Sequence, residues 1–404
     1  MLVTLFGTAL AMIALVIGGA AAGRQDPPQT LKSGVELVMV DAQVVDRKGA
    51  PIEGLTPQQF QVSIGGKRRT VVSAELLDSG TGLPRGTDPG SKPLSSPGNI
   101  YVLAVDQGSF RAVNAPSVVH AARELLKRAH PNDYIGMISF PSPGVVINPT
   151  RDRAELEAAI PKLVGFSALK QMREFRYSLS DALDSAAFGM GGGNDALAAV
   201  VSRNCSDDLI CARAVEMEMN ETISILEMQA ARSLGGLREV VSAVKDIPGR
   251  KTVVVLSAGI PSGDRSGVRM YMRSDAIQAG KEAVAAGILL YTLHLNTAFL
   301  DSFSPDAPSA QQTAMRESSV YAKALETFNG NAAGTFMEVN TGADFAIDRM
   351  MRETSAYYLL GVQVDEADRT GRPERIEVKV NQRGASVRNR ATVTIPKGSG
   401  SLID

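Results

Sequence analysis

The alternation of apolar and amphipathic segments between residues 99 and 345 most constrains how this 404-residue chain can fold. Residues 100–105 form an apolar run typical of a buried strand, and Asp106 stands at its carboxyl end. An amphipathic helix is predicted at 116–129 and a second strand at 134–140. Strands and helices that alternate in this way imply right-handed crossovers and a sheet covered on both faces. We therefore predict a doubly wound, mostly parallel α/β domain whose ligand crevice lies at the carboxyl ends of the strands.

The same alternation continues to the end of this region. An aspartate that precedes a helix, with a glutamate three residues later, predicts a capped helix start at Asp152 and Glu155. The remaining predicted strands are 145–147, 252–256, 288–293 and 335–339. The remaining predicted helices are 174–188, 215–245 and 311–328.

The flanks of this region have the period of β-strands. Strands are predicted from residue 35 to 74 and again from 357 to 395, and neither flank holds enough of them for a stable sheet pair alone. We therefore expect residues 34–78 and 355–396 to combine into one small β-sandwich-like domain. A Gly/Ser/Pro-rich linker, residues 79–98, leads into the α/β domain at 99–345, which is an insertion in that sandwich.

The N-terminus predicts export. Residues 2–22 are continuously apolar and end in three alanines, which is typical of a signal peptide (1–22) cleaved near Ala22. No Lys or Arg precedes the apolar run, and an uncleaved membrane anchor is the alternative, because the run is nearly long enough to span a bilayer. In either case we expect the remainder to be periplasmic or secreted and associated with the cell envelope.

Cysteine content and charge agree with this compartment. Cys205 and Cys211 are close in sequence, and in an oxidising compartment they predict a structural disulfide. The formal net charge is −1 and Trp is absent, so the composition favours neither nucleic acid nor an acidic ligand.

Signatures of common enzymes are missing. The sequence has no G-x-S-x-G elbow, no H-E-x-x-H pair and no phosphate-binding G-x-x-x-x-G-K-[ST] loop. Of the histidines, His120 and His130 are expected to be structural, while His294 ends a predicted strand and could face the crevice. No carboxylate partner can be assigned to His294, so we predict that the protein is not an enzyme.

Several of these segments resemble a known family. The run from residue 100 to Asp106 with its following helix, residues 133–140 and residues 248–261 resemble the von Willebrand factor type A domain. Residues 44–56 with Phe60, and residues 357–361, are similar to the exported von Willebrand factor A-related proteins abundant in Acidobacteria. The resemblance spans nearly the whole mature chain.

The resemblance implies a metal-ion-dependent adhesion site at the carboxyl edge of the sheet. In the family this site holds Mg²⁺ with a D-x-S-x-S motif, a threonine and a later aspartate. Asp106 matches the first aspartate, but Gly108 and Phe110 occupy the serine positions, and Ala258 stands where the later aspartate belongs. The threonine position falls at Tyr177 or Ser178, so the predicted site is degenerate.

Two interpretations of Asp106 follow. It could hold a weakly bound Mg²⁺ with Ser109, Ser178 and Ser257 or with waters. It could instead cap the turn after its strand by accepting backbone N–H groups. With His294, these residues form the candidate binding edge.

The leading hypothesis is a non-enzymatic, exported protein-binding module without a cofactor, whose partner protein is unknown. Mg²⁺-dependent adhesion through Asp106 is the first alternative. A hydrolase that uses an unrecognised Ser/His pair is the second, and a purely structural role in the envelope is the third.

Overall fold

The computed structural model describes residues 37–397, apart from residues 88–89, 142–143, 168–173, 187–192, 264–270, 298–310 and 341. The side chains of residues 193–194 and 311–314 are also outside the description. The predicted signal peptide, residues 1–22, lies outside the described residues. Within the described part of the chain, no helix has the length and apolarity needed to cross a membrane.

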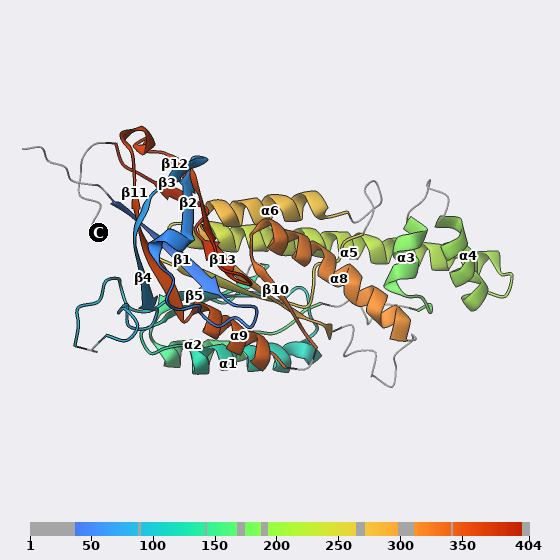
Figure 1. Cartoon of the computed structure of the whole chain (residues 1–404). Coiled ribbons are helices and arrows are strands. Elements are labelled where there is room, and N and C mark those ends of the chain that lie inside the picture. Colours follow the sequence, from blue (N-terminus) through green and yellow to red (C-terminus); the bar gives the residue numbers. More distant parts are fainter. Residues whose placement is uncertain are drawn as a thin grey trace, which may run out of the picture. The chain divides into compact units, whose positions relative to one another are not determined.

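A six-stranded sheet in the order β10-β9-β8-β5-β6-β7 forms the centre of the α/β region (Figure 1). Neighbouring strands are parallel, except that β7 is antiparallel to β6. This confirms the predicted doubly wound, mostly parallel sheet. Its strands are β5 (Ile100–Asp106), β6 (Tyr134–Phe140), β7 (Val146–Thr150), β8 (Lys251–Ser257), β9 (Ile288–Leu295) and β10 (Thr335–Val339).

Helices cover both faces of this sheet because successive side chains of each strand point to opposite sides. Tyr101, Leu103 and Val105 of β5 pack with one layer of helices, and Val102 and Ala104 pack with the other. The first layer contains α1 (Ala115–Arg128), α2 (Arg153–Ala159) and α9 (Asp344–Thr354). The second contains α5 (Leu209–Val244), α6 (Arg273–Ala285) and α8 (Gln311–Asn331).

The predicted helix cap at Asp152 is present. Its carboxylate accepts the backbone N–H groups of Ala154 and Glu155 at 2.9 and 3.1 Å, which satisfies two of the free donors at the start of α2. The neighbouring strands β5 and β8 are parallel, so Gln107 and Ala258, which follow them, both lie at the carboxyl edge of the sheet. In doubly wound folds the ligand crevice lies at this edge.

Strands from the two flanks of the chain form a β-sandwich. One sheet has the order β13-β1-β11-β4 and the other β14-β12-β2-β3, and buried apolar side chains from both sheets form one core. The central β1 pairs with β11, so the N- and C-terminal flanks are joined as predicted and the α/β region is inserted between them. These strands are β1 (Leu37–Val45), β2 (Phe60–Ile64), β3 (Lys67–Arg69), β4 (Val71–Asp78), β11 (Ala356–Gln363), β12 (Pro373–Val380), β13 (Ser386–Asn389) and β14 (Thr392–Thr394).

A buried carboxylate joins the sandwich to the α/β region. Glu353, near the end of α9, is 0% exposed, and its Oε2 accepts from Arg388 Nη1 of β13 at 2.6 Å and from Tyr291 of β9 at 2.8 Å. Its Oε1 accepts from Arg349 Nε at 2.9 Å. Both oxygens of this carboxylate are therefore used in holding three elements together.

Additional helices pack against α5 away from the sheet. The helices α3 (Leu179–Ala186) and α4 (Gly193–Asn204) contact α5, and Cys205 is bonded to Cys211 as predicted. The helix α5 begins earlier than predicted because Asp208 caps it, accepting the N–H of Ile210 at 2.8 Å. The helix α3 begins at Leu179, later than the predicted start at 174.

Candidate functional site

Asp106 lies at the carboxyl end of β5 and is fully buried, with 0% of its surface exposed. Ser233 of α5 donates its hydroxyl to Oδ1 at 3.0 Å, and Ser257 of β8 donates to Oδ2 at 2.9 Å. Both carboxylate oxygens therefore already accept hydrogen bonds from protein hydroxyls. The carboxylate connects a strand, its neighbouring strand and the helix that covers them.

The loop after Asp106 is fastened to the loop after β8 by a serine. The Ser109 hydroxyl donates to the carbonyl oxygen of Asp106 at 2.7 Å and accepts the N–H of Ala258 at 2.8 Å. The Ser257 hydroxyl in turn accepts the N–H of Gly259 at 3.1 Å. This closed network contains three of the predicted edge residues, Asp106, Ser109 and Ser257.

The residues around Asp106 do not fit a metal ion. Phe110, at a position where the family has serine, is 1% exposed and packs in the apolar core, and Ala258 is 3% exposed. A hard cation needs several oxygen ligands with free lone pairs. Phe110 and Ala258 supply no side-chain oxygen at the two positions that the resemblance assigns to ligands, and the Asp106 carboxylate already accepts from two serines.

Burial raises the pKa of Asp106 to about 7, although hydrogen bonds from Ser257, Ser233, the Gly108 N–H and Ser109 lower it. A carboxyl group with this pKa is protonated in a substantial fraction of molecules near neutral pH. Protonation further weakens Asp106 as a cation ligand.

The structure places Ser178 in a different environment from Asp106. Its hydroxyl lies 2.9 Å from that of Ser180 and accepts the Asp181 N–H at 3.0 Å, so it caps the start of α3. The adjacent Tyr177 hydroxyl lies 2.8 Å from that of Thr222 on α5. The helix α3 contacts α4, α5 and α8. Ser178 and Tyr177 thus belong to the helical cluster at α5.

His294 lies on β9 opposite Ser257 in the strand register and is 1% exposed. Burial lowers its pKa, although Glu338 and the nearby backbone of Ala258 raise it, so the imidazole is neutral. Neither ring nitrogen has a hydrogen-bond partner among the described residues, and the Phe336 ring lies 5.8 Å away between centroids. Since the Ser257 proton is donated to Asp106, it is not directed at His294.

A groove lies beside this closed network, on the side of β7. It has a volume of about 630 Å³ and an open mouth. Sequence analysis did not identify it, although its first residue, Gln107, directly follows Asp106. We call it the carboxyl-edge groove, and its lining residues are Gln107, Gly144, Val145, Val146, Ile147, Glu155, Ala158, Ala159 and Lys162.

The surroundings of the carboxyl-edge groove are apolar and exposed. Val146 is 68% exposed, and the nearby Val164 and Phe166 are 49% and 54% exposed. The Phe166 N–H donates to the Gln107 carbonyl oxygen at 3.1 Å, which places this segment next to the groove. The side-chain Oε1 of Gln107 is buried without a hydrogen-bond partner in the described part of the chain. The groove and its rim therefore offer apolar side chains together with two charged ones, Glu155 and Lys162.

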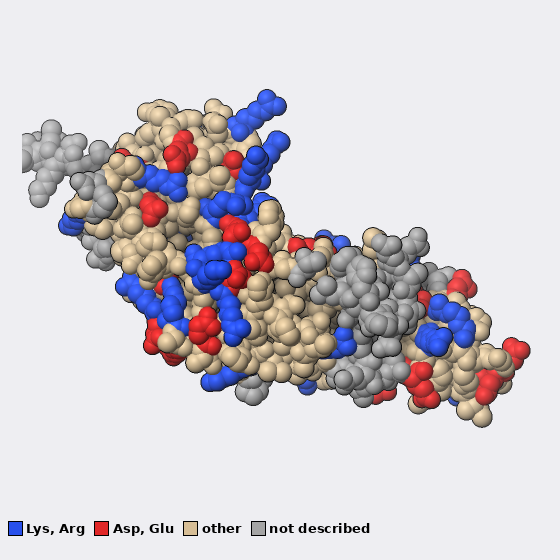
Figure 2. Space-filling model, turned by 90° about the horizontal axis from the view of Figure 1, so that it is seen from below, with Lys and Arg blue, Asp and Glu red and all other residues tan. Residues whose placement is uncertain are grey.

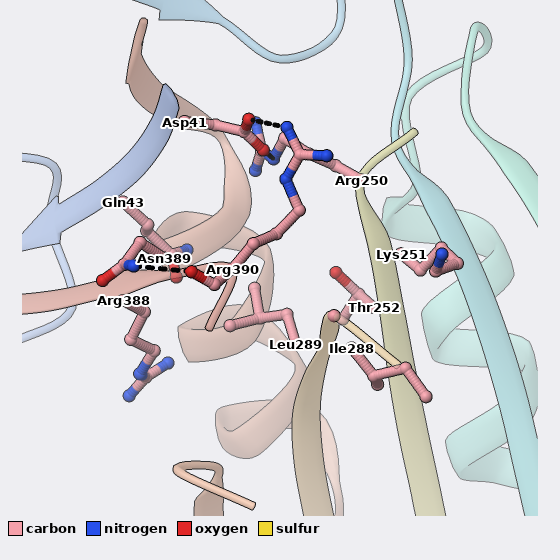
Figure 3. Close-up of a pocket in the computed structure, with 11 residues that line it drawn as sticks. Asp41, Gln43, Arg250, Lys251, Thr252, Ile288, Leu289, Arg388, Asn389 and Arg390 are labelled. Carbon is pink, nitrogen blue, oxygen red and sulfur yellow. Dashed lines mark hydrogen bonds and ion pairs between the residues drawn. The ribbon is translucent and has the colours of Figure 1, made fainter. Parts of the chain in front are cut away.

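A smaller cavity of about 40 Å³ lies at the opposite, amino edge of the sheet, between it and the sandwich (Figure 3). Asp41 of β1 bonds Arg390 at 2.7 Å and lies 3.9 Å from Arg250. The Lys251 ammonium donates to two backbone carbonyls near the end of α5 at 2.7 and 3.0 Å. Most of the polar groups that line this cavity already have partners in the protein, so we interpret it as part of the contact between the sandwich and the α/β region.

No protein-family model and no curated protein matches this chain. Among solved structures, the VWA domain of SpRpn10 is 8% identical, with 62% of this chain and 93% of that chain covered and a TM-score of 0.26. The human COPII-coat protein Sec24c is also 8% identical, with 74% of this chain and 44% of that chain covered and a TM-score of 0.25. These values are too low to support an inference, so the description of the fold rests on the strand order given above.

Proposed function

We propose that the protein is an exported, non-enzymatic protein-binding module that holds an extended segment of its partner in the carboxyl-edge groove. The groove beside the closed Asp106 network is the observation that carries this proposal. Exposed apolar side chains of this kind, grouped around a groove at the functional edge of a doubly wound sheet, are typical of interaction sites.

The edge strand β7 supports an extended peptide as the occupant. It is the last strand of the sheet order, so its outer backbone groups are free of a strand partner in the described region. An added strand would pair with these groups and insert alternate side chains into the groove. Glu155 and Lys162, which line the groove, would select the charges of the segment.

We propose that this binding is independent of metal at Asp106. The support is that both carboxylate oxygens accept serine hydroxyls and that Phe110 and Ala258 replace two ligands. Absence of catalysis is part of the same proposal, since the His294 ring has no carboxylate or hydroxyl partner among the described residues.

Export is supported by the Cys205–Cys211 disulfide, because disulfides persist in oxidising compartments. Fractionation of the producing cells tests this. We expect the chain outside the cytoplasm and its new N-terminus just after Ala22. A cytoplasmic chain with reduced cysteines would refute export.

The groove is tested by capture from an envelope extract with the immobilised protein. A partner identified by mass spectrometry should be retained in EDTA and lost on Val146→Asp or Ala158→Glu, because both place a carboxylate in the groove. Val72→Asp is the matched control, since Val72 is 44% exposed on β4 of the sandwich.

Equal capture by groove and control variants would contradict the groove as the binding site. Metal-dependent adhesion would be favoured instead if EDTA abolished capture, Mg²⁺ restored it and Asp106→Ala captured no partner.

A further inference from the structure

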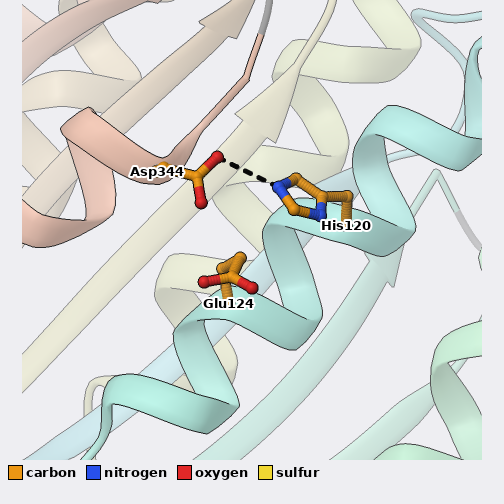
Figure 4. Close-up of side chains that lie close together, drawn as sticks. All are labelled: His120, Glu124 and Asp344. Atoms are coloured by element: carbon orange, nitrogen blue, oxygen red, sulfur yellow. Dashed lines mark hydrogen bonds and ion pairs between the residues drawn. The ribbon is translucent and has the colours of Figure 1, made fainter.

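A second set of polar residues lies on the helix layer, outside the carboxyl-edge groove. His120 and Glu124 are four residues apart on α1, so they lie one turn apart on the same face. Asp344, the first residue of α9, meets them from the neighbouring helix (Figure 4). Helices α1 and α9 are in contact, and both belong to the layer that packs on the same face of the sheet.

The three side chains converge on one point. His120 Nε2 lies 3.0 Å from Asp344 Oδ2, and one ligand atom from each of the three residues lies within 4.8 Å of the others. A tetrahedral Zn²⁺ with bonds of about 2.0–2.1 Å holds its ligands about 3.3 Å apart. Small side-chain rotations would therefore bring the three atoms to coordination distance.

The local charge favours a cation at this point. Glu124, Asp344 and Asp348 all contact Arg128, with Asp344 Oδ1 at 3.4 Å from Arg128 Nη2. Among the described residues, Lys127 also pairs with Glu124, but it is 76% exposed and 3.9 Å away. Three carboxylates thus share one well-placed guanidinium. On the face that Figure 2 shows, acidic and basic side chains mostly lie intermixed.

We propose that His120, Glu124 and Asp344 bind one borderline divalent transition-metal ion of the Zn²⁺ type, which links α1 to α9. One imidazole and two carboxylates suit such an ion better than Mg²⁺ or Ca²⁺, which prefer oxygen ligands alone. Half of the His120 and Asp344 side-chain surface is exposed, so the fourth position opens to solvent. This site does not depend on the proposed function of the groove.

Metal titration of the full chain, first treated with EDTA and then freed of chelator, tests the proposal. With Co²⁺ as the probe, we expect visible absorption typical of a tetrahedral site, saturating at one ion per chain. With Zn²⁺ we expect heat of binding in calorimetry and a rise in the thermal midpoint of unfolding.

His120→Ala should abolish both signals, and Asp344→Asn should weaken Zn²⁺ binding at least about tenfold, since each removes a ligand. The matched controls are His130→Ala and Asp348→Asn, which change a histidine at the end of α1 and an Arg128 partner outside the trio; both should bind normally. Circular dichroism checks that each variant is folded. Absence of Zn²⁺ uptake by the wild-type chain, or uptake unchanged in both His120→Ala and Asp344→Asn, would overturn the proposal.

Discussion

Two groups of carboxylates in this molecule differ in what surrounds them. Asp106 is 0% exposed, and serine hydroxyls occupy both of its oxygens. Asp344, on the helix layer, is 49% exposed and contacts the His120 imidazole and the Arg128 guanidinium. The first is the aspartate at which the sequence resemblance predicts a metal site, and the second belongs to no predicted motif.

The difference suggests a criterion for which carboxylate can hold a cation that is separate from its place in a motif. A ligand must keep lone pairs directed at a place that an ion can reach. Ser233 and Ser257 already donate to both oxygens of the buried Asp106, whereas half of the Asp344 side-chain surface is exposed. The following substitutions are ordered by the size of effect that we expect.

Glu353 is buried like Asp106 and paired with arginine like Asp344. It therefore tests whether burial or ion pairing decides how much a carboxylate stabilises the fold. Glu353→Ala leaves Arg388 buried without a carboxylate, and we expect a loss of about 3–5 kcal/mol in the free energy of unfolding. Urea denaturation measures this loss. The control Glu366→Ala removes an 89% exposed carboxylate and should cost less than about 1 kcal/mol. Similar losses for both variants would show that burial is not the deciding factor.

The raised pKa of Asp106 predicts a pH-dependent stability. Because the pKa rises from 3.8 to about 7 on folding, the stabilisation is fully present below pH 3.8 and is lost as the pH rises through about 7. The whole difference corresponds to at most about 4 kcal/mol. Relative to Asp106→Asn, which stays neutral, the wild-type chain should therefore lose stability between pH 4 and 8.

Urea unfolding of both proteins at several pH values measures that difference, and titrations of other groups cancel in the comparison. Parallel stability curves for the wild type and Asp106→Asn would contradict the assignment of a raised pKa.

Removing one hydroxyl from the Asp106 network should have a smaller effect. Ser257→Ala takes away the donor to Oδ2, and we expect a loss of about 1–3 kcal/mol in unfolding free energy. It should also move the pH midpoint of the Asp106 effect upward, because the lost hydrogen bond lowers the pKa in the native chain. Ser202→Ala, on an exposed face of α4, is the control. An unchanged midpoint would mean that Ser257 does not hold the carboxylate.

The smallest effect is expected at the exposed carboxylate. Without metal, Asp344→Asn should leave the thermal midpoint of unfolding close to that of the wild type, because solvent screens exposed ion pairs. Thermal unfolding in EDTA measures this. A fall in the midpoint as large as that of Ser257→Ala would show that Asp344 stabilises the fold without any ion.

The sequence was sufficient to predict the sheet and its first strand end. The apolar runs at β5, β8 and β9 have the length and composition of buried parallel strands. The two flanks could be assigned to one sandwich because neither holds enough strands for a stable sheet pair alone. Asp106 could be placed at the carboxyl edge because β5 ends there.

The immediate partners of Asp106 could not be predicted in the same way. Ser233 lies in the middle of α5, 127 residues away, and nothing in the local pattern of a helix shows which buried serine faces which strand end. Ser178 was aligned with the edge by motif order alone, but α3 packs on α4 and α5 instead. The carboxyl-edge groove, with Gln107 in its lining, forms where β7 and α2 lie apart. The spacing of apolar residues predicts strands and helices, but it does not predict how far apart two of them lie.

The pairing of β1 with β11 has a consequence for how the chain folds. Leu37 lies beside Gln363, so the sandwich brings together residues more than three hundred positions apart. Contacts of such high sequence separation form late, because a long loop must close first. During synthesis from the N-terminus, β1 and β4 emerge without β11, the strand that pairs with both of them. The inserted domain can complete its own sheet in that interval, and the sandwich closes only when β11 arrives. A chain interrupted before residue 356 would leave β1 and β4 as open strand edges prone to aggregation.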